Sequence, residues 1–252
     1  MLAGLTSVLI VVSGCQTKPE SSPNSPTLAP HLVAPLEFAQ FTVADIHSHE
    51  GINNLWQMKL KTADYEFLGT NFNDPRIQVE TAREFLAALH QGYAPQTTAE
   101  ISTASWFYTA TAQLLFMDKA APAKAALLGK QALKQMPVSI LNWFEGDERE
   151  KLERDSAKGV TLQDCTTSYA RRRIQHLKIK DGTMTFSDDG CDYAVKELAR
   201  GDFDQDGFED VLVVVATYYQ GGSGRGYAFY IASKTDPRQK VLSLTKMNFT
   251  DK

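Results

Sequence analysis

Five acidic residues lie within nine positions near the C-terminus, in the segment DFDQDGFED at positions 202–210. Aspartates at alternate positions of a loop direct their carboxylates toward one point, and Gly207 permits the sharp reversal that this requires. Calcium takes six to eight oxygen ligands at about 2.3–2.6 Å and tolerates irregular geometry, whereas magnesium demands a strict octahedron. The segment therefore predicts a calcium site. Its expected ligands are four carboxylates and one backbone carbonyl, from Asp202, Asp204, Asp206, Phe208 (the carbonyl) and Asp210.

The alternative for this loop is a solvated acidic turn, in which crowded carboxylates repel one another and raise their pKa values. An EF-hand is excluded because the twelfth position holds Val213 where that motif has glutamate. The flanks are typical of strand, loop and strand. Over about residues 200–215 the chain resembles the calcium loops of FG-GAP and VCBS repeats. One copy does not make a propeller, so the resemblance implies the metal site and no wider architecture.

A second group with metal-binding chemistry is DIHSHE at positions 45–50. His47-x-His49 resembles the first metal motif of amidohydrolase barrels, which implies a metal-dependent hydrolase as an alternative function. Those enzymes need further histidines spread over a barrel, and this chain offers only His31, His90 and His176 without a repeating strand–helix pattern. Histidines of a turn or surface are the simpler interpretation. We expect no catalytic residues and a binding or structural role.

The N-terminus carries the features of an exported, lipid-anchored protein. An apolar run at positions 2–12 ends in Val12-Ser13-Gly14-Cys15, which resembles the lipobox of bacterial lipoproteins. The resemblance implies a signal peptide over residues 1–14 and a lipidated Cys15. Residues 15–36 are predicted to be a disordered tether rich in proline and serine. Gln16 is not the aspartate of an inner-membrane retention signal, so in a bacterial envelope with two membranes the outer one is favoured.

Two further cysteines, Cys165 and Cys191, remain once Cys15 is assigned to lipid. An oxidising compartment would allow them to form a disulfide. The closed loop would stabilise the fold by about 3–4 kcal/mol on the chain-entropy model. Two buried thiols are the alternative, since spacing alone does not bring Cα atoms within reach.

Composition limits the classes of partner. The chain of 252 residues has 26 basic and 30 acidic side chains, a net charge of −4, which argues against nucleic acid as a partner. No apolar run reaches the roughly 20 residues of a membrane-spanning helix. The expected partners are the membrane, through the lipid anchor, and an envelope protein or glycan.

The elements that must position these residues divide the chain into two regions. Residues 37–160 are expected to be mainly helical. Apolar spacing and helix-forming residues predict helices over 77–92, 98–118, 121–135 and 138–157, and alternation predicts a short strand within 55–68.

Residues 161–252 are expected to form a β-rich module that carries the calcium loop. Strands are predicted over 173–180, 193–199, 211–219, 227–231 and 241–244, with an Asp181-Gly182 hairpin turn. The segment VLVVVATYY at 211–219 is apolar at successive positions, which is typical of a central strand covered on both faces. The glycine-rich segment 220–226 is interpreted as a hairpin connection and not as a phosphate loop. From residue 199 to 233 the chain is similar to uncharacterised exported bacterial proteins. The predicted fold is α+β, with a helical N-terminal layer packed on a C-terminal antiparallel sheet.

Overall fold

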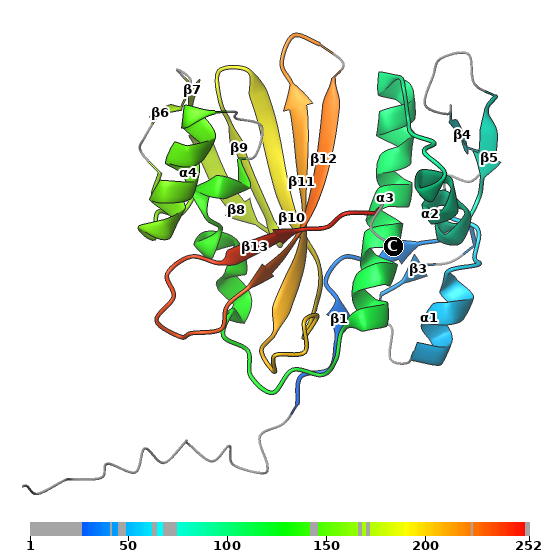
Figure 1. Ribbon diagram of the computed structural model, residues 1–252, viewed down its shortest axis with the longest axis horizontal. Coiled ribbons are helices and arrows are strands. Elements are labelled where there is room, and N and C mark those ends of the chain that lie inside the picture. Colours follow the sequence, from blue (N-terminus) through cyan, green and yellow to red (C-terminus); the bar gives the residue numbers. More distant parts are fainter. Residues whose placement is uncertain are drawn as a thin grey trace, which may run out of the picture.

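The computed structural model describes residues 27–40, 42–44, 49–61, 65–67, 75–141, 146–165, 168–169, 172–222 and 224–249. It is a mixed α+β structure built around a seven-stranded antiparallel sheet (Figure 1). The strand order is β13-β12-β11-β10-β9-β8, and β1 pairs with β10 outside this path. These strands are β1 (His31–Leu32), β8 (Gln175–Lys180), β9 (Thr183–Ser187), β10 (Cys191–Gly201), β11 (Asp210–Tyr219), β12 (Arg225–Ser233) and β13 (Ser243–Lys246).

The central strand β11 has an apolar environment on both faces, as its sequence predicts. Val211, Val213 and Val215 belong to one hydrophobic cluster. Leu212 and Val214 belong to a second cluster on the other side of the sheet. Since side chains alternate along a strand, two buried faces require cover both above and below the sheet.

The cover on one face is built around the long helix α3 (Thr98–Lys119), which contacts β10, β11 and β12. Helices α1 (His49–Leu55) and α2 (Ala82–His90) and two small hairpins lie on the same side (Figure 1). The hairpins pair β2 (Leu36–Glu37) with β3 (Thr42–Val43), and β4 (Tyr65–Phe67) with β5 (Ile77–Val79).

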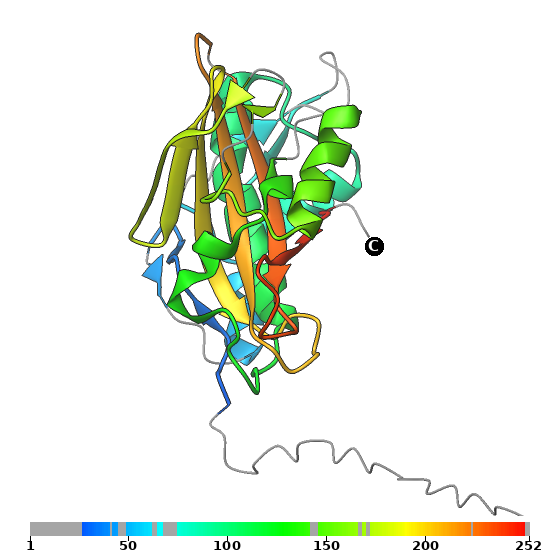
Figure 2. The same cartoon turned by 90° about the vertical axis from the view of Figure 1, so that its left-hand side faces the viewer.

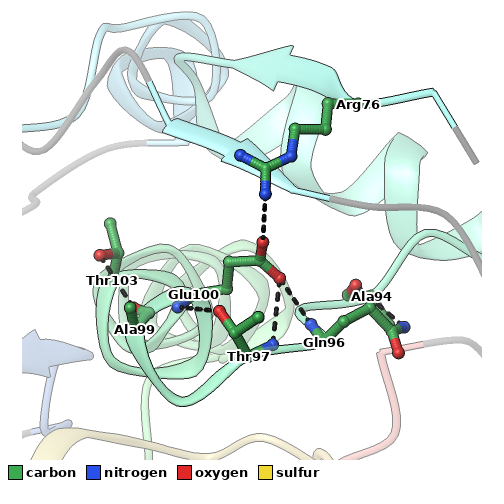
Figure 3. A network of polar contacts seen from close by, with 7 residues as sticks. All are labelled: Arg76, Ala94, Gln96, Thr97, Ala99, Glu100 and Thr103. Carbon is green, nitrogen blue, oxygen red and sulfur yellow. Dashed lines mark hydrogen bonds and ion pairs between the residues drawn. The ribbon is translucent and has the colours of Figure 1, made fainter. Parts of the chain in front are cut away.

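The start of α3 is fixed by a capping box (Figure 3). The Thr97 hydroxyl accepts from the Glu100 N–H at 3.2 Å, and the Glu100 carboxylate accepts from the N–H groups of Gln96 and Thr97 at 2.7 and 3.2 Å. The same carboxylate pairs with Arg76 at 3.3 Å. Satisfied N–H groups and a nearby negative charge both stabilise a helix N-terminus, so the first turn of α3 is held firmly.

The opposite face of the sheet is covered by shorter elements that also come from the first 160 residues (Figure 2). They are the 3₁₀ segments η1 (Gly129–Gln135) and η2 (Val138–Ile140) and helix α4 (Asp147–Ala157). The small hairpin β6 (Ser168–Tyr169) with β7 (Arg172–Arg173) follows them in the chain. The helical N-terminal layer expected from residues 37–160 is therefore not confirmed. That region supplies both covers and contains short strands of its own.

Helix α3 confirms the helix predicted over 98–118, but three other predictions need correction. Within 77–92, residues 77–79 are strand β5, because the Thr81 capping box starts α2 only at Ala82. Within 55–68, α1 extends to Leu55, and residues 59 and 60 form only isolated bridges before β4. The helix predicted over 121–135 is reduced to η1. Its first residues pair with other segments, at the bridges Ala121–Asp202 and Ala125–Phe208, and tertiary pairing overrides helix propensity.

The folded body begins earlier than the predicted end of the tether at residue 36. Leu28 bridges Ala123, β1 pairs with β10, and the N–H groups of Val33 and Ala34 donate to the Leu198 carbonyl. Leu32 and Leu36 are buried, which gives this segment the apolar contacts that a tether lacks. Among the described residues, no helix is both long and apolar enough to cross a membrane.

Candidate metal centre

The aspartate loop, residues 202–210, joins β10 to β11 at one end of the sheet, beside the C-terminal end of α3 (Figure 1). Asp202 and Ala121 exchange both backbone hydrogen bonds, at 2.8 and 3.0 Å, and the Gly207 carbonyl accepts from Lys124 at 2.9 Å. The Phe203 ring stacks on Phe116 of α3 with centroids 5.3 Å apart. The loop is therefore held by backbone pairing on one side and by an aromatic contact on the other.

Three carboxylates of this loop converge. Ligand oxygens of Asp202, Asp204 and Asp210 all lie within 4.8 Å of one another. Asp202 and Asp210 are buried, at 3% and 1% exposure, whereas Asp204 is exposed. Two oxygens bound to one calcium ion are at most about 5 Å apart, since each lies about 2.3–2.6 Å from the ion. The spacing would allow the three carboxylates to share one cation, and Asp204 is the exposed member of the group.

The Oδ1 atom of Asp202 is buried without a hydrogen-bond partner. Its Oδ2 atom accepts from the Gly207 N–H at 2.8 Å. A buried carboxylate oxygen with no partner is costly, and native proteins rarely leave one without water or an ion. This oxygen is the feature of the loop that an acidic turn by itself does not explain.

The other carboxylates also use one oxygen to shape the loop. Asp210 Oδ2 accepts from the Phe203 N–H at 2.8 Å, and Asp204 Oδ1 accepts from the Asp206 N–H at 3.1 Å. Gln205 and Gly207 adopt left-handed φ values of 64° and 94°, which confirms the predicted reversal at the glycine. Each carboxylate has a second oxygen, so the same groups that fold the loop can bind a cation.

The pKa values of Asp206 and Asp210 are raised, which indicates that the negative charges of the loop are not fully balanced. Burial raises the pKa of Asp210 to about 6, and the nearby Asp204 charge adds to the rise. Hydrogen bonds from Ser233 and from the backbone of Phe203 oppose it. The pKa of Asp206 is also raised, by partial burial and then by the charges of Asp204 and Asp202, against the Phe208 N–H. Carboxylates whose charged forms are disfavoured in this way gain most from a divalent cation.

One of the five predicted ligands, Asp206, is not part of the converging group of carboxylates. Asp206 is exposed, and its Oδ1 atom accepts from the Phe208 N–H at 2.8 Å, so it caps the turn. Phe208 forms a parallel bridge with Ala125 through the backbone on either side of it. The structure thus brings Asp202, Asp204 and Asp210 together and gives Asp206 a local structural role. The Phe208 carbonyl stays a predicted ligand.

The last acidic residue of the loop belongs to a buried ion network that the sequence analysis missed. Glu209 pairs with Arg200 at 3.1 Å, and Arg200 pairs with Glu197 at 2.7 Å. The Arg200 guanidinium also donates to the Gly129 carbonyl at 2.7 Å. A signal for this network exists in the sequence. Glu197 and Arg200 flank the apolar pair Leu198-Ala199 in β10, and charged residues are rarely buried unless they are paired.

The remaining predicted site residues lie elsewhere. Cys15 and His47 lie outside the described residues, and His49 is described only as the first residue of α1. Cys165 and Cys191 form no disulfide in the structure, and both contribute to the hydrophobic cluster on the α4 side of the sheet. This arrangement corresponds to the alternative of thiols packed as small apolar groups. The glycine-rich segment forms the β11–β12 hairpin connection, as expected.

No known protein family, curated protein or solved structure matches this chain. The similarity to FG-GAP loops therefore rests on the residues of the aspartate loop alone. Any function must be argued from the geometry of the site.

Proposed function

We propose that the aspartate loop binds one calcium ion and that the ion has a structural, non-catalytic role in an envelope lipoprotein. The observation that carries the proposal is the buried, unpartnered Oδ1 atom of Asp202, in a residue whose carboxylate converges with those of Asp204 and Asp210. An oxygen-only set favours a hard cation, and the irregular loop suits calcium better than magnesium.

The position of the loop indicates what a bound ion would do. The loop joins the two central strands and pairs through its backbone with residues 121–125, directly after α3. A cation shared by Asp202 and Asp210 would tie the end of β10 to the start of β11. Because such a site does not exist in the unfolded chain, binding free energy would appear as stability.

The test compares Asp202→Asn with wild type in calcium and in chelator. At a hundredfold excess of calcium over its dissociation constant, the gain is about 2.7 kcal/mol, or about 5–10 °C in Tm for a protein of this size. Asp202→Asn keeps an oxygen for the Gly207 N–H but loses the charge. It should therefore lose the calcium response, while in chelator it should melt at or above the wild-type temperature, because carboxylate repulsion is relieved.

The matched control is Asp181→Asn, which removes an exposed aspartate from the β8–β9 turn. It should keep the full calcium response. The same titration with magnesium tests the choice of ion, and a larger response to magnesium would refute calcium. If wild type melts at one temperature in excess calcium and in excess chelator, and calorimetry detects no binding, the loop is an acidic turn.

The location of the protein is a proposal that rests on the sequence. The lipobox-like Val-Ser-Gly-Cys and the tether behind it support cleavage before Cys15, a lipid anchor and the outer membrane. Stable anchoring takes two signals, and the two or three acyl chains of such lipidation would supply them. Cys15→Ser should shift the protein from the membrane to the soluble fraction or leave it uncleaved. Intact mass of the native protein showing an unmodified Cys15 within an uncleaved chain would refute the anchor.

The metal-dependent hydrolase has no comparable support. It depends on His47 and on the side chain of His49, which lie outside the described part of the chain. Metal analysis separates the two functions directly. Calcium at one ion per chain supports the structural role, whereas stoichiometric zinc would favour the hydrolase.

A further inference from the structure

A groove lies between the N-terminal half of α3 and strands β10–β12. Figure 1 shows that this end of α3 is opposite to the end beside the aspartate loop. We refer to this groove as the α3 groove. Its hollow has a volume of about 380 Å³, and the side chains that define it are Ser102, Ser105, Trp106, Lys196, Tyr218 and Arg225. This volume lies within the range of small-molecule sites in proteins, about 300–1,000 Å³.

The groove exists because the apolar face of the sheet ends before the helix does. Phe229 pairs in register with Val214, and both pack in the cluster beneath α3. Toward the β11–β12 connection, the next pair on the same face is Ala216 with Tyr227, and the one after it is Tyr218 with Arg225. The side chains of Ser102 and Ser105 on the helix and of Ala216 on the sheet are small, so a hollow remains between the two.

The charge of the groove is positive in a protein whose net charge is −4. Lys196 and Arg225 line it, and no carboxylate of the described residues does so. Arg225 Nη1 donates to the Ser102 hydroxyl at 2.8 Å, and the guanidinium lies 5.6 Å from the centre of the Tyr218 ring. A cation that is already oriented by two contacts loses little entropy when it binds an anion.

Aromatic faces and hydroxyl oxygens complete the lining. Trp106 and Tyr218 are 49% and 38% exposed, although large aromatic side chains are usually covered. The Ser105 hydroxyl donates to the Ser102 carbonyl and the Thr109 hydroxyl to the Ser105 carbonyl, which leaves their oxygens as acceptors. Burial and the neighbouring Tyr227 raise the pKa of Tyr218 against the effect of Arg225, so its hydroxyl stays a donor.

The hollow does not end at these residues. A wider one of about 730 Å³ shares Ser102, Tyr218 and Arg225 with it and reaches Tyr219 and the glycines of the β11–β12 connection. A ligand longer than one ring could therefore lie along the helix. The capping box and the Arg76–Glu100 pair hold this end of α3 in place (Figure 3), so the helical wall is preorganised.

We propose that the α3 groove binds an acidic oligosaccharide. Sugar rings present apolar faces for Trp106 and Tyr218, and sugar hydroxyls match the acceptors and donors of the lining. Carboxylates on the sugar would pair with Arg225 and Lys196. Single-stranded nucleic acid also offers rings and negative charge, but proteins that bind it usually carry an excess of basic residues, whereas this chain has a net charge of −4.

The test uses trigalacturonate as the probe, with calorimetry in a chelator so that calcium plays no part. Wild type should bind it, and neutral galactotriose should bind at least about tenfold more weakly, because it lacks charge-assisted hydrogen bonds. Arg225→Gln and Lys196→Gln should each weaken binding by about ten- to a hundredfold, with a Tm close to wild type. Lys196 is exposed, so its variant separates a loss of binding from a loss of folding.

The charge-matched control is Arg238→Gln, an exposed arginine outside the groove, and it should bind as wild type does. Asp202→Asn should also bind normally, because the proposed calcium site and the groove lie at opposite ends of α3. Three results would overturn the proposal: no binding of trigalacturonate, equal binding of galactotriose, or unchanged binding in both groove variants. Tighter binding of a thymidine oligomer than of trigalacturonate would assign the groove to nucleic acid instead.

Discussion

Replacing Arg200 by methionine should destabilise the protein severely, and its structure allows the cost to be worked out. The guanidinium makes hydrogen bonds of 3.1 and 2.7 Å to Glu197 Oε2, 3.1 Å to Glu209 Oε2 and 2.7 Å to the Gly129 carbonyl. The side chains of Arg200, Glu197 and Glu209 are only 11%, 7% and 6% exposed. Methionine preserves much of the volume but leaves two buried carboxylates without a cation.

Removing one partner of a buried ion pair costs about 3–5 kcal/mol, chiefly because the remaining charge is left desolvated. For a protein of this size the Tm should then fall by about 6–20 °C. Adding Glu197→Gln and Glu209→Gln to Arg200→Met should recover a large part of the loss, since neutral amides cost less to bury than charges. The calcium response should weaken in the single variant, because Glu209 lies within the aspartate loop.

The assay is urea denaturation of wild type, Arg200→Met, the triple variant and Arg238→Met. Arg238 pairs with Asp236 at 2.9 Å, a similar distance, but its side chain is 91% exposed. Arg238→Met should unfold at the same urea concentration as wild type within error, because solvent screens exposed ion pairs. Burial, and not the N–O distance, is expected to determine how much this ion network stabilises the protein. A decrease of less than about 1 kcal/mol in the free energy of unfolding of Arg200→Met would refute this expectation.

Three further predictions concern the aspartate loop and the start of the fold. Gly201→Ala should destabilise the protein by about 1–3 kcal/mol in urea denaturation, because a Cβ there would lie 2.9 Å from the Ala120 Cβ and 3.0 Å from the Pro30 Cβ. In chelator, the free energy of unfolding should fall as pH rises from about 4 to 6, because the folded state holds the Asp210 proton to about pH 6 and the unfolded state releases it near 3.8. Excess calcium should reverse that trend, and Asp210→Asn should flatten it; a wild-type slope unchanged by calcium would contradict the shared site. Deleting residues 1–26 should leave Tm unchanged, whereas deletion through residue 36 should lower it, since Leu32 and Leu36 are buried.

Much of the local structure follows from the sequence, because it depends on neighbours along the chain. The apolar run of β11 indicates a central strand with two buried faces, and both hydrophobic clusters confirm this. The Asp181-Gly182 pair takes left-handed φ values of 48° and 69°, as a tight hairpin turn requires. Alternating aspartates and Gly207 likewise predict a curled acidic loop. In each case a short-range conformational preference agrees with the final fold.

Other features depend on which distant segments meet. Residues 121–125 have helix-forming side chains, yet they pair with the aspartate loop, because backbone pairing outweighs a weak propensity. Asp206 has the spacing of a ligand, but the turn uses its carboxylate to cap Phe208, and only tertiary contacts select Asp202, Asp204 and Asp210.

The ion network and the groove show the same dependence over longer distances. Arg200 joins residues 129, 197 and 209, and the α3 groove places Ser102 beside Arg225, more than a hundred positions away. Residue types and spacing thus determined the turns, the central strand and the chemistry of the loop. Burial in the tertiary structure determined the ion network, the three converging aspartates and the groove. The free energy of a charge or an apolar side chain depends on what surrounds it in space, and sequence spacing does not encode those neighbours.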